Sequence, residues 1–160
     1  MDFDLSFPAV SDLRARARRR IPHFAFEYLD SGTGAELQVS RNREALDAIL
    51  FLPDVLPGAM APKFTTTFLG DTFERPFGIA PVGMSGVMWP GAEKILAATG
   101  AKHGIPYTLS SVATRTPEDV GPHAGGRGWF QIYCPEDATI RRDILRRAKE
   151  AGFRPGHSGR

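Results

Sequence analysis

The sequence predicts an α/β fold in which parallel strands alternate with helices. Three apolar runs support this prediction, and each ends abruptly in small or polar residues; they begin at Ile79, Leu109 and Trp129. They recur at intervals of roughly 25 residues, as strand–helix–strand units do. The carboxyl ends of parallel strands meet at one edge, where such folds keep their chemistry. We therefore expect the functional residues where these runs end.

A helical segment is expected before the first of these runs. Ser11 can cap a helix over 13–21, and Pro22 ends that helix or opens the next one, over 23–29. A third helix is expected over 35–50, with three inward-facing apolar side chains, Leu37, Leu46 and Ile49.

A connector over 52–67 is expected to run along the surface, because it carries Pro53, Pro57 and Pro62. A short strand over 65–69 follows, with a turn at Gly70 and Asp71.

The repeating part begins near Pro76, with strands expected over 77–80, 107–110 and 128–133. A helix over 91–103 lies between the first two strands. Its residues available for packing are Ile95, Leu96, Ala98 and Ala101.

Two more helices complete this part. Thr116 and Pro117 open a short one as N-cap and first helical residue. The last helix begins at Asp137 or Thr139 and ends at Gly152. Its apolar stripe consists of Ile140, Ile144, Leu145 and Ala148.

Composition favours an ordinary globular protein, with 42% hydrophobic and 24% charged residues among 160. The net charge of +2 is too small to indicate an acidic partner. A single cysteine, Cys134, excludes an internal disulfide framework and fits a reducing cytosol. The four histidines lack metal-ligand spacing, so we expect no metal site. No apolar run approaches the roughly 18 residues of a membrane span, and a cytoplasmic location is expected.

Several segments together resemble the FMN-dependent α-hydroxy-acid dehydrogenase and oxidase family, which includes L-lactate dehydrogenase, mandelate dehydrogenase and glycolate oxidase. The resemblance runs from residue 8 to Phe153 and covers less than half of a full family member. The matching segments are Phe26-Glu-Tyr-Leu-Asp-Ser-Gly32, Asn42, Pro76-Phe-Gly-Ile-Ala-Pro-Val-Gly83, His103-Gly-Ile-Pro-Tyr-Thr-Leu-Ser-Ser111 and Phe130-Gln-Ile-Tyr133.

The resemblance implies a (β/α)8 TIM barrel that binds FMN and oxidises an L-2-hydroxy acid to the 2-oxo acid. By this resemblance, Tyr28 and Tyr133 contact the substrate. The implied cofactor-binding residues are Pro81, Val82, Gly83, Ser110 and Gln131. Serine and glutamine at strand ends can orient a flavin without charge, and small residues let the backbone approach a flat ring. The resemblance also implies homo-oligomers, and a peripheral position at the inner face of the cytoplasmic membrane is a further expectation.

The match departs from the family in two places. Val112 stands where some family oxidases carry a tryptophan, which leaves the substrate open between lactate and mandelate types. From Arg154 onward the sequence has no strand character, which predicts an aberrant tail over 154–160 and a truncated chain. The family's general-base histidine lies beyond the C-terminus, so no catalytic residue is assigned here.

The expected organisation is therefore a helical segment and connector over 1–75, three β/α units of an incomplete barrel over 76–153, and the tail. We expect a catalytically incompetent fragment of an oxidoreductase. Two alternatives stay open: a non-catalytic remnant or split subunit, and a module that binds nucleic acid or an anionic surface. The second rests on Arg14, Arg16, Arg18, Arg19 and Arg20, which on a helix spread around most of its circumference. A solvated helix, with no nucleic-acid partner, is our expectation.

Overall fold

The computed structural model describes residues 3–53, 58–59 and 61–155. The chain divides into two units, Met1–Pro62 and Lys63–Arg160. Unit 1 is helical, and its helices are α1 (Phe3–Ser6), α2 (Val10–Arg20), α3 (His23–Asp30) and α4 (Leu37–Asp47). All three longer helices were predicted.

The first of these, α2, begins earlier than predicted, and Ser11 is not its cap. The helix starts at Val10, and the Asp12 carboxylate accepts a hydrogen bond from the free N–H of Ala9 over 3.0 Å. Asp12 can do this because its side chain reaches back to the open first turn. Pro22 both follows the end of α2 and precedes α3, as N-cap of the latter.

Arg14 and Arg16 of α2 have partners within unit 1. The Arg14 guanidinium donates to both carboxylate oxygens of Asp30 in α3, with Nη2 2.7 Å from Oδ2. The guanidinium carbon of Arg16 lies 4.9 Å from the centre of the Phe7 ring. The positive charges of Arg14 and Arg16 therefore hold α2 within its own unit.

The predicted inward face of α4 is wrong in the described structure. Its apolar side chains are exposed, by 64% at Leu37 and 66% at Leu46, and Ile49 beyond its end is exposed by 68%. Among the described residues of the unit, the buried hydrophobic side chains are Ala25 and Phe26, which are too few to form a core that covers that helix. Part of the predicted connector, residues 54–57 and 60, lies outside the described residues.

Unit 2 begins with a β-hairpin that lies over one face of the parallel sheet. The predicted strand over 65–69 is confirmed as β1 (Thr66–Phe68), which pairs antiparallel with β2 (Asp71–Phe73). The turn lies at residues 69–70, one residue earlier than predicted. The sequence did not predict β2, because Asp-Thr-Phe is too short to show an alternating pattern.

The parallel sheet consists of β3 (Tyr107–Ser110), β4 (Gly128–Gln131) and β5 (Arg154–Pro155), in that order. The predicted strand over 107–110 is confirmed, and that over 128–133 is confirmed as far as Gln131. The predicted strand over 77–80 is reduced to a bridge from Ile79 to Tyr107. Prolines at 76 and 81 flank that segment and supply no N–H for a ladder.

The last strand corrects the prediction for the tail. Arg154 and Pro155 were expected outside any strand, yet they pair in parallel with Trp129 and Phe130. The buried Phe153 positions the following residues beside β4, and the Arg154 guanidinium forms an ion pair with the Asp71 carboxylate. Burial of the phenyl ring and pairing with an existing edge outweigh the poor strand propensity of Arg-Pro.

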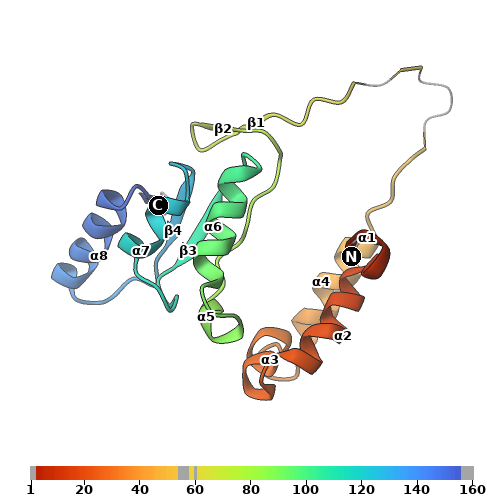
Figure 1. Ribbon diagram of the computed structural model, residues 1–160, viewed down its shortest axis with the longest axis horizontal. Coiled ribbons are helices and arrows are strands. Elements are labelled where there is room, and N and C mark those ends of the chain that lie inside the picture. Colours follow the sequence, from red (N-terminus) through yellow and green to blue (C-terminus); the bar gives the residue numbers. More distant parts are fainter. Residues whose placement is uncertain (1–2, 54–57, 60, 156–160) are drawn as a thin grey trace. The chain divides into compact units, whose positions relative to one another are not determined.

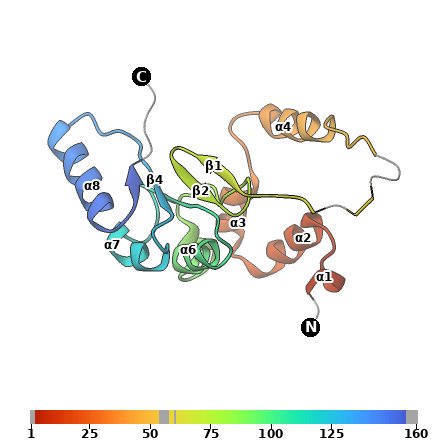
Figure 2. The ribbon, with the colours of Figure 1, turned by 90° about the horizontal axis from the view of Figure 1, so that it is seen from above.

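Helices lie along one side of this sheet, with the hairpin on the other (Figures 1 and 2). They are α5 (Ser85–Met88), α6 (Ala92–Lys102), α7 (Pro117–Val120) with the 3-10 turn η1 (Gly121–His123), and α8 (Ala138–Glu150). The core between helices and sheet consists of Ala97, Tyr107, Leu109, Val120, Ala124, Phe130, Ala148 and Phe153.

The packing face of α6 was predicted only in part. Leu96 packs against the core, but Ile95 and Ala98 are exposed. The buried positions are Glu93, Ala97 and Gly100. Small residues at the last two let the helix lie close to the sheet, while Ile95 is turned outward.

The ends of α7 and α8 follow the prediction closely. Thr116 caps α7 by accepting from the Asp119 N–H over 3.4 Å. Asp137 caps α8 by accepting from the N–H groups of Thr139 and Ile140 over 2.6 and 3.2 Å. Gly152 follows α8 with a φ of 89°, which a glycine adopts without strain. Of the predicted stripe, Ala148 is buried and Ile140 is exposed.

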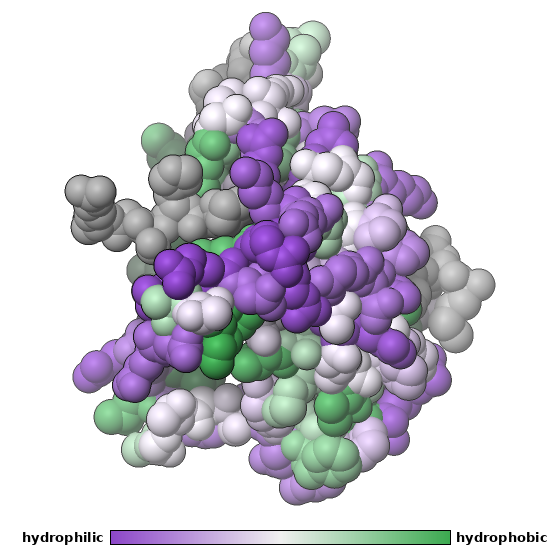
Figure 3. All heavy atoms as spheres, turned by 90° about the vertical axis from the view of Figure 1, so that its left-hand side faces the viewer, coloured by the Kyte–Doolittle hydropathy of each residue, from purple (hydrophilic) through white to green (hydrophobic). Residues whose placement is uncertain are grey.

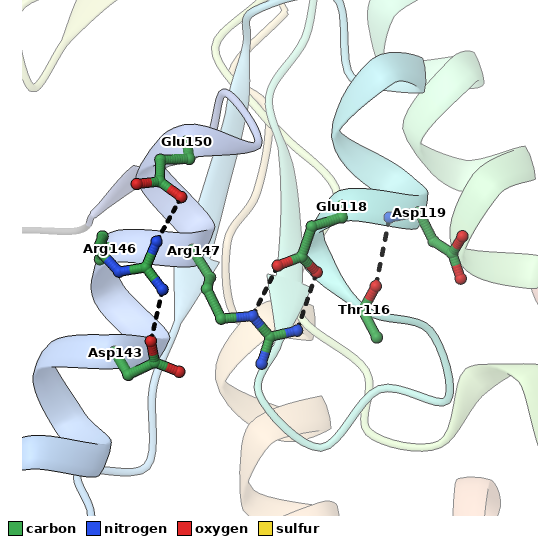
Figure 4. A network of polar contacts seen from close by, with 7 residues as sticks. All are labelled: Thr116, Glu118, Asp119, Asp143, Arg146, Arg147 and Glu150. Atoms are coloured by element: carbon green, nitrogen blue, oxygen red, sulfur yellow. Dashed lines mark hydrogen bonds and ion pairs between the residues drawn. The ribbon is translucent and has the colours of Figure 1, made fainter.

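The outer side of α8 is charged, and the face of the molecule that carries it is largely hydrophilic (Figure 3). The Arg147 guanidinium links α8 to α7 by donating from Nε and Nη2 to the two carboxylate oxygens of Glu118, over 2.7 and 3.0 Å (Figure 4). Arg146 pairs with Asp143 and Glu150 of its own helix. Of these pairs, that between Arg147 and Glu118 joins α8 to α7, whereas those of Arg146 lie within α8.

Candidate functional site

The two faces of the parallel sheet differ in chemistry. Tyr107, Leu109 and Phe130 point into the core under the helices. Successive side chains of a strand point to opposite faces, so the other face carries Thr108 and Ser110 from β3 and Trp129 and Gln131 from β4. This second face is polar at the carboxyl ends of its strands, where the functional residues were expected.

A cavity of about 350 Å³ opens on the amino-terminal part of this second face. Phe68 and Phe73 of the hairpin pack there on Trp129, with ring centres 5.6 and 5.5 Å from its indole. The cavity lies beneath the strand ends, and none of the predicted site residues lines it. Its lining is mainly apolar, so it lacks the converging polar groups of a reaction site.

The loops that follow the strands are tied to one another by hydrogen bonds. We call residues 81–83, 110–112 and 131–133 the strand-end rim. The N–H of Met84, next to the first rim segment, donates to the carbonyl oxygen of Val112 over 2.9 Å. The N–H of Ser111 donates to the carbonyl of Gln131 over 2.9 Å, and the N–H of Tyr133 donates to the hydroxyl of Ser111 over 3.1 Å. The structure thus brings Ser110, Gln131 and Tyr133 together, and Met84 ties the end of the first rim segment to Val112.

Ser110 and Gln131 contact each other directly at the ends of β3 and β4. The Ser110 hydroxyl is buried, lies 3.1 Å from Oε1 of Gln131 and donates to it. The same hydroxyl accepts from the N–H of Val112 over 3.2 Å. Oε1 of Gln131 is therefore engaged. Its Nε2 makes no hydrogen bond to another described residue, so the amide presents donors to the rim.

The first rim segment presents backbone donors. Pro81 is exposed, and Val82 and Gly83 are half-buried. The N–H groups of Val82 and Gly83 make no hydrogen bond to any residue within the described ranges. Together with Nε2 of Gln131, they can donate to an acceptor placed against the rim.

The two predicted substrate-binding tyrosines lie in different units. Tyr133 follows β4 in the rim and is 69% exposed. Tyr28 lies in α3 of unit 1 and is 49% exposed, beside the buried Phe26. The structure places Tyr133 next to the other rim residues through its N–H bond to Ser111.

A buried carboxylate beside the rim was missed by the sequence reasoning. Glu93 in the first turn of α6 is fully buried, and its Oε1 accepts from the N–H of Gly86, the N–H of Thr114 and the hydroxyl of Thr114, over 3.1, 3.0 and 2.7 Å. Burial acts to raise its pKa, but hydrogen bonds led by that of Thr114 outweigh it, and the pKa of Glu93 is lowered. The signal was available: Glu93 occupies the first position of the i, i+4, i+7 stripe that Ala97 and Gly100 continue.

Comparison with known proteins shows the family of the chain. The family model for FMN-dependent dehydrogenase matches residues 17–155. The chain therefore belongs to the FMN-dependent dehydrogenase family, whose cofactor is FMN. It is 38% identical over 144 residues to L-lactate dehydrogenase of Pseudomonas paraeruginosa strain PA7, and 38% identical over 142 residues to that of Acinetobacter baumannii strain ATCC 17978. These matches cover 90% and 89% of this chain.

Solved structures show the same fold. A mandelate oxidase structure is similar with a TM-score of 0.84 and 28% identity, over 92% of this chain and 43% of that one. A mutant of the active chimera of (S)-mandelate dehydrogenase has a TM-score of 0.82 and 29% identity, over 90% of this chain and 40% of that one. The chain spans 38% of the length of the L-lactate dehydrogenase from P. paraeruginosa.

The donor set of the rim fits the edge of a flavin. The isoalloxazine ring offers carbonyl oxygens and ring nitrogens that accept hydrogen bonds, and the rim offers uncharged donors from Gln131, Val82 and Gly83. The small Gly83 leaves room for a flat ring to approach the backbone. Among the described residues, no group of His, Cys, Asp or Glu could hold a metal ion, and no helix is long and apolar enough to span a membrane.

Proposed function

We propose that this chain supplies the flavin-facing side, and one substrate-facing side, of an enzyme that oxidises a 2-hydroxy acid of the lactate or mandelate type to the 2-oxo acid. The observation that carries the proposal is the joined set of uncharged donors at the rim. In this proposal unit 2 is the first part of a (β/α)8 barrel, whose remaining strands would continue from β5. The family assignment and the parallel, unclosed sheet support it.

Each rim residue has a proposed task. Gln131 donates from Nε2 to the flavin edge, and Ser110 fixes the orientation of that amide by donating to its Oε1. Pro81, Val82 and Gly83 lie along the ring, with the two N–H groups directed to its acceptors. When bound, FMN supplies the electron acceptor for the oxidation of the hydroxyl group.

The tyrosines are proposed to bind the substrate. A phenol can donate to a carboxylate while its ring packs on apolar surface, and Tyr133 is exposed at the rim for such a contact. Tyr28 is proposed to contribute the same kind of contact from α3. The substrate's carboxylate is the group that both phenols can recognise.

The oxidation also requires a base that removes a proton from the substrate. Among the described histidines of unit 2, His103 and His123 precede β3 and β4 and thus lie at the opposite end of the strands from the rim. Both are exposed. We therefore propose that residues 1–160 alone bind at the flavin edge but do not turn over substrate.

An anaerobic reduction assay tests this proposal. The purified chain is mixed with excess FMN and then with L-lactate or (S)-mandelate, and the visible absorption band of the flavin is followed. The proposal predicts a perturbed band that is not bleached by either acid. Addition of the C-terminal part of the P. paraeruginosa L-lactate dehydrogenase, from the end of the matched segment onward, is expected to permit bleaching. Bleaching by the chain alone would contradict the division of the site.

A further inference from the structure

We propose that Glu93 is a positioning residue that fastens two rim loops together and so sets the backbone that faces the flavin. The first loop follows Ile79 and leads into α5, and we count Gly86 of α5 with it; the second follows β3 and includes Thr114. The fastening itself is independent of any ligand. Its effect on flavin binding rests on the function proposed above.

The hydrogen bonds of Glu93 are divided between the two loops. Oε1 accepts from Gly86 in the first and from both the N–H and the hydroxyl of Thr114 in the second. Gly86 and Thr114 are far apart in sequence, so one oxygen atom joins the segment that follows the Ile79 bridge to the segment that leaves β3. Each segment also carries rim residues, Val82 and Gly83 in one and Ser110 to Val112 in the other.

The two loops meet too closely at this point for a side chain on Gly86. A Cβ atom on Gly86 would lie 2.0 Å from the Thr114 hydroxyl oxygen and 3.1 Å from Oε2 of Glu93. The glycine therefore permits the contact, and the carboxylate holds it. The Met84 N–H to Val112 carbonyl bond, over 2.9 Å, joins the same loops nearer the rim.

Burial of the Glu93 carboxylate costs free energy, and the need to fill the core does not explain why a carboxylate stands here. Glu93 is fully buried, and its Oε2 has no hydrogen-bond partner among the described residues. A buried, half-satisfied carboxylate is less favourable than an apolar side chain in a site that only needs filling. Its place in the first turn of α6, where the helix dipole favours negative charge, reduces this cost. We infer that loop position, rather than core volume, is what Glu93 provides.

Amide hydrogen exchange by NMR and FMN titration on the full chain test this inference. In Glu93→Ala, the amide protons of Gly86 and Thr114 are expected to exchange about tenfold faster, while that of Thr108, bonded to Ile79, changes far less. Glu93→Gln keeps an acceptor and is expected to restore slow exchange at both amides. Leu109→Ala is the control for general destabilisation, and it should change all three amides alike.

The FMN titration distinguishes failure of this inference from failure of the proposed function. Compared at equal folded fraction, Glu93→Ala is expected to bind FMN about fivefold more weakly than wild type, and Leu109→Ala equally well. Unchanged exchange at Gly86 and Thr114 in Glu93→Ala would overturn the inference, as would equal FMN affinity in the two variants. If wild type binds no FMN, the proposed function is wrong, and the exchange rates alone decide whether Glu93 fastens the loops.

Discussion

The hydroxyl of Ser110 donates to Oε1 of Gln131 over 3.1 Å, joining the last residues of β3 and β4. The direction of this hydrogen bond decides which end of the Gln131 amide stays available. It engages the acceptor end of the glutamine amide and leaves the donor end for the rim. A pair of uncharged side chains thereby acts as an oriented donor, which suits a neutral ring edge better than an arginine or lysine would.

Ser110→Ala should weaken FMN binding while leaving the fold intact. Loss of the bond to Gln131 frees the amide to rotate, and one hydrogen bond of this kind is worth roughly 0.5–1.5 kcal/mol. We expect the dissociation constant to rise about two- to tenfold, measured by quenching of FMN fluorescence. Thr108→Ala removes a hydroxyl from the same face of β3 and is the matched control. Equal weakening in both variants would argue against the assigned orientation.

Leu109→Ala should destabilise unit 2 strongly. Leu109 is fully buried at the centre of the core under the helices. Removal of a buried leucine side chain costs about 2–5 kcal/mol of unfolding free energy. Urea denaturation measures the loss, and Ile140→Ala, at a 53% exposed position of α8, should change stability by less than about 0.5 kcal/mol. Similar losses in the two variants would contradict the core described above.

Acid should weaken the link between α7 and α8. The hydrogen bond from Arg147 is the main cause that lowers the pKa of Glu118 from its ordinary 4.5 to about 2. Because the folded-state pKa is depressed, the contribution of Glu118 to stability is present above pH 4.5 and is lost as the pH falls toward 2. The pair is partly exposed, so solvent limits its contribution to less than about 1 kcal/mol.

Glu118→Gln should therefore reduce the difference in urea midpoint between neutral pH and acid. Glu150→Gln is the comparison, because Glu150 pairs with Arg146 within α8 alone and does not join the two helices. An acid response of Glu118→Gln identical to that of wild type would refute the link.

Alkali should destabilise unit 2 through Tyr107. Burial, and secondarily the charge of Glu93, raises the pKa of Tyr107 from 10.0 to about 12. The raised folded-state pKa means that this contribution to stability is complete below pH 10 and is lost as the pH rises toward 12. Ultraviolet titration should show a late tyrosinate phase that is missing in Tyr107→Phe. Identical titration curves for the two proteins would show that Tyr107 is not shielded.

The sequence predicted the elements of unit 2 well where local chemistry decides them. Thr116 caps its helix as expected, Asp137 is one of the two starts expected for α8, and the strand over 107–110 was predicted to the residue. Capping depends on a residue's own side chain and the next few N–H groups, so it is visible in the sequence. The strand-end position of Ser110 followed from the same local pattern, whereas the strand predicted over 128–133 ends at Gln131.

Features that depend on tertiary contact were missed. The strand at Arg154 forms because β4 offers an edge, and no propensity of Arg-Pro predicts it. The face of α6 was misjudged because Ile95 is exposed while Glu93 is buried, a reversal made favourable by hydrogen bonds from distant loops. The roles of individual rim residues came from family resemblance, since periodicity cannot distinguish a flavin contact from an ordinary strand end.

Titration of FMN with the purified chain, followed by flavin fluorescence, tests the central claim most directly. We expect saturable quenching by wild type and by Gln38→Ala, which removes an exposed glutamine side chain from α4 of unit 1. Gln131→Ala should bind FMN at least about fivefold more weakly, because the donor at the rim is lost. No quenching by wild type, or equal affinities in the two glutamine variants, would contradict the assignment of the strand-end rim as the flavin-facing side.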